Sequence, residues 1–388
     1  MSRLIKLIIF AKTLDGGTGT YVLELLDLQK ELDGKYKKKI LILEKPNFRK
    51  VDQSKFSFWA NQNYYPEKYK FTPSNLIKFI SEIFWLKRHI DEFKPNIILT
   101  VDSHTLLLTG FLKLISGNKI PTVSTIHNNL KDVLKIKSTP FLGKILYYII
   151  RFFLVRSNYL VCVGNDLAEG LKDYFKLDKK PISIYNGLSI KAAKKYKEYS
   201  PTSKIILSIG RLSEQKDYST LLKAFSIFQK EVHSATLLIV GDGPEKAKIK
   251  KMAVDCNISS HVKFLGWVQN PTKIIRDADL FVLSTKREGL PYVLVEAMSQ
   301  GIPTVSSDVK FGPSEILGNG KYGKLVPPNN PIEMAKAFKE ILGSERIYNQ
   351  YAKSALVRSG YFSKGKMLKN YKDLLLKALE KSTRKVYE

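Results

Sequence analysis

Residues 284–301 read Ser-Thr-Lys-Arg-Glu-Gly-Leu-Pro-Tyr-Val-Leu-Val-Glu-Ala-Met-Ser-Gln-Gly, a sequence in which a strand passes through a short loop into a helix. The apolar run at 279–283 is typical of a buried strand. Pro291 suits the first turn of a helix, because its missing N–H would have no helical partner there anyway. Glu288 is therefore expected in the loop, and Glu296 in the helix about 7 Å beyond Pro291 along its axis.

The loop between the two glutamates offers backbone amides to an anion. The amides of Gly289, Leu290 and Tyr292 lie at or just before the expected helix start, where N–H groups attract phosphate. Carboxylates, in turn, accept hydrogen bonds from hydroxyl groups. A ligand with phosphates in its middle and a hydroxyl-bearing ring at each end fits this arrangement, and a nucleotide sugar is such a ligand.

The pattern Glu-Gly-Leu-Pro-x-x-x-x-Glu-Ala, with Glu288 and Glu296 at its two glutamates, resembles the signature of the retaining GT-B glycosyltransferases of family 4. Two glutamates at this spacing alone are typical of a solvated helix face, whereas the residues between them and the Gly-Ile-Pro-Thr-Val run at 301–305 make the pattern specific. The resemblance implies an α/β protein with the GT-B fold, in which two Rossmann-like, doubly wound parallel-sheet domains face each other across a cleft. It also implies transfer of a hexosyl or N-acetylhexosaminyl group from a nucleoside diphosphate sugar to a hydroxyl, with retention at the anomeric carbon.

Length and composition agree with two domains. The chain has 388 residues, 44% of them hydrophobic, which is long for one core. No stretch of 18 residues is free of charge, and the start of the chain lacks the features of a signal peptide, so we expect a cytoplasmic protein. Cys162 and Cys256 fall in different predicted domains, which argues against a disulfide framework or a cysteine metal site.

The net charge of +28 is spread along the chain. Residues 1–200 hold 34 Lys and Arg against 18 Asp and Glu, and the remainder hold 30 against 18. This excess of positive charge is compatible with a general lysine bias, with attraction to the anionic inner face of the cell membrane, or with nonspecific nucleic-acid binding. No zinc-finger spacing, recognition-motif aromatics or heptads support the last, so we expect no specific nucleic-acid partner.

A strand at 3–10 is followed by a glycine-rich turn at 13–20 and a helical pattern from Tyr21. Such a turn allows phosphate to approach the backbone, but Val22 stands where the dinucleotide fingerprint requires glycine, which weakens a dehydrogenase interpretation. The family resemblance implies that Gly16 and Gly17 leave room for the donor phosphates and the acceptor. A tight turn that needs positive φ would explain the same glycines.

Further strands are expected at 39–43, 96–101 and 121–126, with helices between at least the last two, which predicts a mostly parallel sheet. His127 follows the third of these strands, at the edge where ligands of parallel sheets bind. A lone histidine is more often a surface or core residue, but the resemblance implies that His127 hydrogen-bonds a donor-sugar hydroxyl rather than acting as a nucleophile. His104 lies at a similar edge.

Two segments, 71–93 and 141–156, combine aromatic and aliphatic residues with interleaved Lys and Arg. The charges exclude a comfortable membrane-spanning helix, whereas a helix in the membrane interface and a helix packed on the sheet would both have this composition. If the acceptor is lipid-linked, these segments are where peripheral contact with a membrane is expected.

The first domain is expected to cover 1–198 and the second 199–365, with a C-terminal helix at about 366–388 that packs back on the first domain. The strand-like segment 181–188 resembles the last strand of the first domain in this family, and the polar stretch 191–203 is interpreted as the linker.

The second domain opens with a strand at 204–212 that leads into Gly-Arg-Leu-x-x-x-Lys-Asp. Arg211 and Lys216 place two cations in one loop, where they could neutralise a diphosphate, although a solvated basic loop is the simpler alternative. The resemblance assigns both to the donor diphosphate, where they would stabilise charge on the leaving phosphate.

The remaining expectations follow from the resemblance. Glu288 holds the donor sugar, Glu296 holds the ribose, and Val268, in a strand-like segment at 264–268, contacts the base through its backbone. The residues expected to bind the donor are Gly16, Gly17, Arg211, Lys216, Val268, Glu288, Gly289, Leu290, Pro291 and Glu296. Arg211, Lys216, Glu288 and His127 are expected to be catalytic.

We expect a UDP-sugar rather than a GDP-sugar as donor, a saccharide acceptor that is lipid-linked, and no metal or other cofactor, since side-chain cations already neutralise the phosphates. Gly-Pro-x-Glu-Ile at 312–316 resembles a subgroup that acts on surface polysaccharides such as lipopolysaccharide. Three other functions stay open: a glycosidase with paired carboxylates, a non-hydrolysing nucleotide-sugar epimerase of the same fold class, and a basic nucleic-acid-binding protein.

Overall fold

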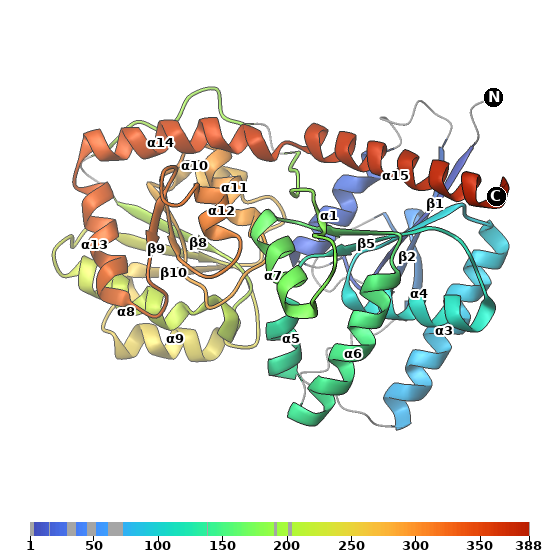
Figure 1. Cartoon of the computed structure of the whole chain (residues 1–388). Coiled ribbons are helices and arrows are strands. Elements are labelled where there is room, and N and C mark those ends of the chain that lie inside the picture. Colours follow the sequence, from blue (N-terminus) through green and yellow to red (C-terminus); the bar gives the residue numbers. More distant parts are fainter. Residues whose placement is uncertain are drawn as a thin grey trace. The chain divides into compact units, whose positions relative to one another are not determined.

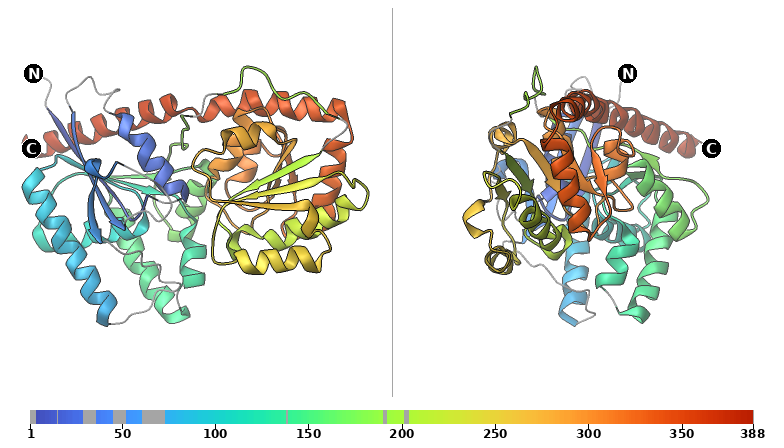
Figure 2. Two further views of the ribbon diagram at one scale, coloured as in Figure 1. Left: turned by 180° about the vertical axis from the view of Figure 1, so that it is seen from behind. Right: turned by 90° about the vertical axis from the view of Figure 1, so that its left-hand side faces the viewer.

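The computed structural model describes residues 4–14, 16–28, 36–44, 52–60, 73–137, 139–189, 192–200 and 204–387. The chain divides into an N-terminal unit, Met1–Gly187 with Lys364–Glu388, and a C-terminal unit, Leu188–Ser363. Each unit consists of a central sheet covered by helices on both faces (Figures 1 and 2). Two parallel-sheet α/β units were expected, and this architecture is confirmed.

The division places residues 188–198, which we expected in the first domain, with the C-terminal unit. The backbone explains this difference, because the Leu188 N–H donates to the Phe362 carbonyl at 3.1 Å and the Ala193 N–H donates to the Ser299 carbonyl at 2.8 Å. Both acceptors belong to the C-terminal unit.

The N-terminal sheet has seven parallel strands in the order β3-β2-β1-β4-β5-β6-β7. The strands are β1 (Ile5–Ala11), β2 (Tyr36–Glu44), β3 (Ser57–Ala60), β4 (Ile97–Thr100), β5 (Thr122–Ile126), β6 (Tyr159–Cys162) and β7 (Ile182–Ser183). The helices are α1 (Gly16–Glu24), α3 (Pro73–Phe93), α4 (Ser103–Ser116), α5 (Leu130–Lys137), α6 (Pro140–Arg156), α7 (Asn165–Phe175) and α15 (Lys364–Tyr387). The two central strands β1 and β4 are apolar and almost wholly buried, as expected of a parallel sheet with helices on both faces.

Helix α1 begins at Gly16, whereas the sequence pattern predicted a turn through residue 20 and a helix from Tyr21. Glycine is a poor helix former, so packing must favour the helix here. A Cβ atom at Gly19 would lie 1.7 Å from the Leu14 carbonyl oxygen, so only glycine allows this close approach.

Helices α1 and α15 are held together although they lie far apart in the sequence. The Tyr21 and Tyr371 rings lie 5.8 Å apart, and Lys364 forms ion pairs with Glu24 at 2.7 Å and with Asp27 at 2.5 Å. The C-terminal helix is therefore part of the N-terminal unit.

The C-terminal sheet has six parallel strands in the order β10-β9-β8-β11-β12-β13. The strands are β8 (Ile205–Ile209), β9 (Thr236–Val240), β10 (Val262–Gly266), β11 (Leu280–Leu283), β12 (Thr304–Ser307) and β13 (Lys324–Val326). The helices are α8 (Tyr218–Gln229), α9 (Lys246–Asp255), α10 (Thr272–Asp277), α11 (Tyr292–Ser299), α12 (Pro313–Leu317), α13 (Pro331–Leu342) and α14 (Glu345–Ser359).

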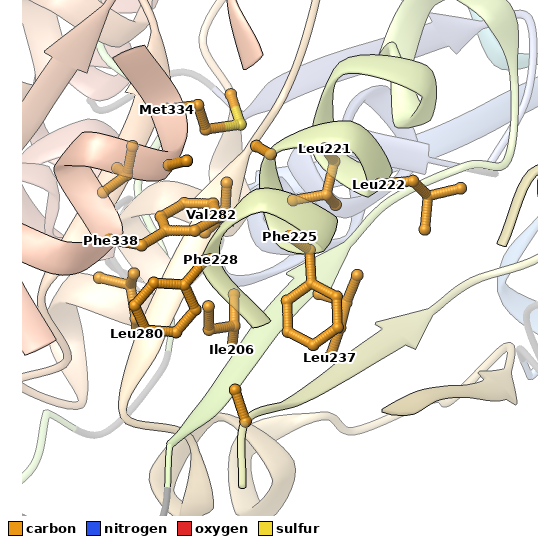
Figure 3. Packing of buried hydrophobic residues seen from close by; sticks show 14 of the residues in the cluster. Ile206, Leu221, Leu222, Phe225, Phe228, Leu237, Leu280, Val282, Met334 and Phe338 are labelled. Carbon is orange, nitrogen blue, oxygen red and sulfur yellow. The ribbon is translucent and has the colours of Figure 1, made fainter. Parts of the chain in front are cut away.

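The core of this unit lies between the sheet and helices α8 and α13. Phe225 and Phe228 of α8 and Phe338 of α13 pack against Ile206, Leu237, Leu280 and Val282 of the strands (Figure 3). The Phe228 and Phe338 rings meet edge to face, with centroids 5.9 Å apart. This packing fixes the strand ends from which the loops of the candidate site extend.

No helix in the part of the chain that the structure describes is long and apolar enough to cross a bilayer.

Candidate functional site

The candidate site lies where the strand order of the C-terminal sheet reverses. Strand β8 pairs with β9 on one side and with β11 on the other, and both partners follow it in the chain. The loop 210–217 leaves the carboxyl end of β8, and the loop 284–291 leaves that of β11. Ligands of doubly wound sheets bind at such a switch point, outside the carboxyl ends of the strands.

A partly buried ion pair joins the two loops. The Lys216 Nζ lies 2.6 Å from the Glu288 Oε1, and the two side chains are only 16% and 9% exposed. The Thr285 hydroxyl also lies 3.0 Å from Glu288 Oε1. An ion pair so little exposed needs a close partner for each charge, and here each has one. Two of the sequence-predicted residues, 72 positions apart, are thus in direct contact.

Hydrogen bonds to backbone carbonyls hold the two loops together around this ion pair. The Lys286 N–H donates to the Gln215 carbonyl at 2.9 Å, and the Gln215 side-chain amide donates to the Arg287 carbonyl at 2.8 Å. The Ser284 hydroxyl donates to the Asp217 carbonyl at 2.7 Å. Because three polar contacts flank the pair, the loops form one preorganised surface.

The Gly289-Leu290-Pro291 segment leads into α11 and is buried. Pro291 occupies the N-cap of α11, one position before the first turn in which we expected it. Gly312 packs against this segment with φ of +88°, and a Cβ atom there would lie 2.4 Å from the Gly289 carbonyl oxygen and 2.8 Å from Pro291 Cδ. Gly312 therefore lets a second loop support the segment from behind.

The other predicted donor residues of this unit take separate positions. Arg211 is exposed two residues beyond the end of β8, on the same loop as Lys216. Glu296 is half-buried on α11, where its backbone carbonyl accepts a hydrogen bond from the Ser299 hydroxyl at 2.7 Å. Val268 is half-buried two residues beyond the end of β10.

In the N-terminal unit, Gly16 and Gly17 form the exposed start of α1, and His127 directly follows β5. His127 is buried, with its ring packed edge-on against Tyr21 at 4.4 Å. Burial lowers the pKa of His127 to about 3, so the imidazole is neutral at neutral pH.

Hydrogen bonds select the tautomer of His127. The Thr125 hydroxyl donates its single proton to the Thr100 carbonyl at 3.0 Å. The His127 Nε2, 3.1 Å from the same hydroxyl oxygen, must therefore be the donor of their contact. Nδ1 is left unprotonated, so His127 can accept a hydrogen bond from a ligand hydroxyl.

A second polar group of the N-terminal unit was not predicted from the sequence. Lys12, Glu44 and His104 follow or end the neighbouring strands β1, β2 and β4, and Lys78 and Glu82 face them from α3. Lys12 Nζ lies 3.6 Å from Glu44 Oε1, and His104 Nε2 lies 2.8 Å from Glu82 Oε2.

Glu44 is the unusual member of this group. It is buried, and its Oε2 has no hydrogen-bond partner among the described residues. Burial raises the pKa of Glu44, while Lys12, Lys78 and His104 act in the opposite direction. The sequence could have pointed to Glu44, because it is a polar residue at the end of an apolar strand. In this unit we used that criterion only for His104 and His127.

Metal ligands are not grouped in the described part of the chain, where no three His, Cys, Asp or Glu side chains are placed to hold an ion.

Comparison with known proteins gives two family matches, one for each half of the chain. Residues 15–191 match the model of glycosyltransferase family 4, and residues 189–357 match that of the glycosyl transferases of group 1. The two matches together reach from residue 15 to residue 357.

Individual relatives agree with these matches. The chain is 27% identical to a Campylobacter jejuni N-acetylgalactosamine-N,N'-diacetylbacillosaminyl-diphospho-undecaprenol 4-alpha-N-acetylgalactosaminyltransferase, over 66% of this chain and 67% of that one. It is 28% identical to the lipopolysaccharide core biosynthesis glycosyltransferase LpsE of Rhizobium meliloti, over 66% and 73% of the two chains. The crystal structure of Anabaena HepE in complex with UDP superposes with a TM-score of 0.74 at 17% identity, covering 96% of this chain and all of HepE.

Proposed function

This chain is a glycosyltransferase of the group 1 and family 4 type with the GT-B fold, and from that premise we propose that it transfers a hexosyl or N-acetylhexosaminyl group from a UDP-sugar to a saccharide acceptor with retention of configuration. The observation that carries the proposal is the Lys216–Glu288 pair at the switch point of the C-terminal sheet. A diphosphate requires cations, a sugar requires hydrogen-bond acceptors, and these loops offer both.

In the proposed reaction, Arg211 and Lys216 bind the diphosphate. When the bond between the anomeric carbon and the phosphate oxygen breaks, negative charge grows on the leaving phosphate, and the two cations stabilise it. The acceptor oxygen bonds to the anomeric carbon from the same face, and its proton passes to the leaving phosphate. No protein side chain is needed as a nucleophile.

The carboxylates and the histidine would position the donor. Glu288, held by Lys216 and Thr285, accepts hydrogen bonds from the transferred sugar, and Glu296 accepts them from the ribose. His127 accepts a bond from a sugar hydroxyl through Nδ1, which its contact with Thr125 leaves unprotonated.

We assign recognition of the acceptor to the N-terminal unit. Glu44 offers a buried oxygen without a partner among the described residues at the ligand edge of the sheet, and a hydroxyl group would satisfy it. The Campylobacter relative is named for a diphospho-undecaprenol-linked acceptor and LpsE for lipopolysaccharide synthesis, which supports a lipid-linked saccharide in surface polysaccharide synthesis and peripheral contact with an anionic membrane.

The proposal is tested by a screen of UDP- and GDP-sugars for slow donor hydrolysis, which requires no knowledge of the acceptor. We expect release of UDP and of a free sugar whose first-formed anomer, followed by NMR, keeps the donor configuration. Formation of an epimeric nucleotide sugar would identify an epimerase instead. Absence of nucleotide binding, together with salt-sensitive binding of nucleic acid, would contradict any transferase.

A further inference from the structure

Exposed hydrophobic side chains are concentrated on three helices of the N-terminal unit. Of the 21 large hydrophobic side chains that are exposed in the described parts of the chain, eleven lie on α3, α4 and α6. They are Leu76, Ile77, Ile80, Phe84, Leu114, Ile115, Phe141, Ile145, Tyr148, Phe152 and Val155. Helix α4 contacts both α3 and α6, so the three helices form one layer (Figure 1). Single exposed apolar residues need no explanation, but a group of this size does.

Helix α6 is apolar on two opposite faces. One face buries Ile150, Phe153 and Leu154, as expected of a helix packed on the sheet. The exposed residues Phe141, Ile145, Tyr148, Phe152 and Val155 follow one another at alternating intervals of four and three residues, which places them in a single stripe along the helix. Phe141 is 77% exposed and Tyr148 is 68% exposed. None of the described residues of the N-terminal unit covers this stripe.

The charged side chains of α4 and α6 all have one sign, and the exposed Asp91 and Glu92 of α3 are paired with Lys87 and Arg88 of the same helix. Helices α4 and α6 contain no Asp or Glu, whereas they carry Lys113, Lys144, Arg151 and Arg156. The Arg156 guanidinium lies 3.6 Å from the centre of the Phe152 ring, which keeps a cation next to the apolar stripe. Aromatic and aliphatic residues flanked only by cations are typical of helices that bind at an anionic lipid interface.

A pocket of about 280 Å³ opens between α4 and α6. Lys113 and Arg156 line it, and no carboxylate does. The Thr109 hydroxyl, which also lines the pocket, is buried and has no hydrogen-bond partner among the described residues. Burial in this position lowers the pKa of Lys113. Two cations and an unsatisfied hydroxyl suit a phosphate group, which supplies the missing negative charge and hydrogen-bond acceptors.

We propose that the layer formed by α3, α4 and α6 docks on an anionic lipid bilayer, with the α6 stripe in the interface and a lipid head-group phosphate in the pocket between Lys113 and Arg156. The proposal deepens the proposed function, in which the acceptor is lipid-linked, because it would bring the N-terminal unit to the surface where such an acceptor resides.

A second copy of the chain is a poorer occupant of this surface. Pairing of α6 with α6 would bring Lys144, Arg151 and Arg156 near the same residues of the partner, and neither α4 nor α6 supplies a carboxylate to neutralise them. A bilayer with anionic lipids supplies negative charge along the whole stripe, at about 1 kcal/mol for each nearby cation.

The test is co-sedimentation of the full chain with phosphatidylcholine vesicles, with and without phosphatidylglycerol. We expect binding to the anionic vesicles that is at least about tenfold tighter than to the neutral ones. The double variant that carries both Phe141→Ser and Tyr148→Ser should bind anionic vesicles about tenfold or more weakly, because two apolar side chains no longer enter the interface. Val357→Ser on α14, a change at a side chain that is 73% exposed, is the matched control and should leave binding unchanged.

A second double variant, with both Lys113→Met and Arg156→Gln, tests whether the pocket binds a lipid phosphate. This variant should lose about tenfold of its affinity for anionic vesicles and keep its weak affinity for neutral ones. Equal vesicle binding by all variants, or none by the wild type, would overturn the docking surface. If light scattering detects a dimer of the wild type, and the double variant Phe141→Ser, Tyr148→Ser is monomeric, the stripe would be assigned to a second copy of the chain instead. Donor hydrolysis is measured in parallel: its absence from the wild type would refute the proposed function without affecting the vesicle result.

Discussion

The two units of this chain present polar groups at the carboxyl ends of their sheets in different ways. In the C-terminal unit, the cation and the carboxylate come from two short loops, and Lys216 and Glu288 neutralise each other at 2.6 Å. In the N-terminal unit, the polar groups come from separate strands and from α3, and Glu44 keeps a buried oxygen without a partner among the described residues. Each of the two C-terminal loops carries a compact sequence motif, although the loops lie 72 residues apart, whereas the N-terminal group collects single residues from several elements.

The surfaces of the two units differ as well. The N-terminal unit carries its exposed apolar side chains as a layer on α3, α4 and α6, while those of the C-terminal unit are scattered singly over several elements. Concentration on one face indicates a surface with a partner, and scatter is ordinary for a folded protein. In the function that we propose, the C-terminal unit supplies most of the donor contacts and the N-terminal unit the access for the acceptor.

The largest effect is expected in the C-terminal unit. Lys216→Ala removes a cation that would stabilise the leaving phosphate, so turnover should fall by about 10²- to 10³-fold, as for the loss of one transition-state donor. Arg211→Ala should have an effect of the same kind. Donor hydrolysis rates measure both.

Lys286→Ala is the control, because its ammonium pairs with exposed Glu214 at 3.2 Å rather than with Glu288, and turnover should be near wild type. Unchanged turnover in both Lys216→Ala and Arg211→Ala would remove these residues from the mechanism.

A stability effect of intermediate size is expected from the N-terminal unit in acid. The folded-state pKa of His127 is about 3, and its ordinary value is 6.5, so between these values the unfolded chain binds the proton and the folded chain does not. The contribution of His127 to the free energy of unfolding should therefore fall by about 1.4 kcal/mol for each unit that the pH drops below 6.5.

Urea unfolding of the wild type and of His127→Gln at pH 7, 6 and 5 measures this effect. The difference between the two proteins should change with pH in the stated direction, and exposed His233→Gln should reproduce the wild-type slope. Parallel pH profiles for the wild type and His127→Gln would show that His127 is not buried in its neutral form.

A smaller and more selective effect is expected at Glu44. Glu44→Gln keeps the shape of the side chain but weakens its hydrogen bond to an acceptor hydroxyl, so the KM for the acceptor should rise about tenfold. Donor hydrolysis without acceptor should stay unchanged, because the donor groups of the C-terminal unit are intact. A loss of donor hydrolysis equal to the loss of transfer would assign Glu44 to structure or to the donor instead.

No effect at all is expected from metal removal. Arg211 and Lys216 already supply positive charge to the diphosphate, so turnover in excess chelator should equal turnover without it. Restoration of lost activity by Mg²⁺ or Mn²⁺ would show that these side chains do not suffice.

The features that sequence predicted well are local. The apolar runs at 96–101 and 121–126 predicted β4 (Ile97–Thr100) and β5 (Thr122–Ile126) to within one residue at each end. The loops that follow β8 and β11 were predicted from glycine, proline and charged residues. The contact between Lys216 and Glu288 was not predicted, because the sequence does not show that β8 and β11 are neighbours; it predicted only that each residue follows a strand of a parallel sheet.

The features that sequence did not predict depend on packing or on distant residues. Helix α1 starts at Gly16 because Gly19 fits against Leu14, which glycine propensity opposes. The Glu44 group unites the ends of β1, β2 and β4, at residues 11, 44 and 100, and that these ends are neighbours is visible only once the order β2-β1-β4 is known. Exposure of the α6 stripe likewise required the structure, since the sequence is equally compatible with a helix buried on both faces.

The central claim, that the loops around Lys216 and Glu288 bind the diphosphate of a nucleotide sugar, is tested most directly by calorimetric titration of UDP into the wild type and Lys216→Ala. We predict that the wild type binds UDP, that Lys216→Ala binds it at least about tenfold more weakly through loss of a charge-assisted contact, and that Lys286→Ala binds it normally. Equal affinity of the wild type and Lys216→Ala for UDP, or no binding of UDP or GDP by the wild type, would contradict the claim.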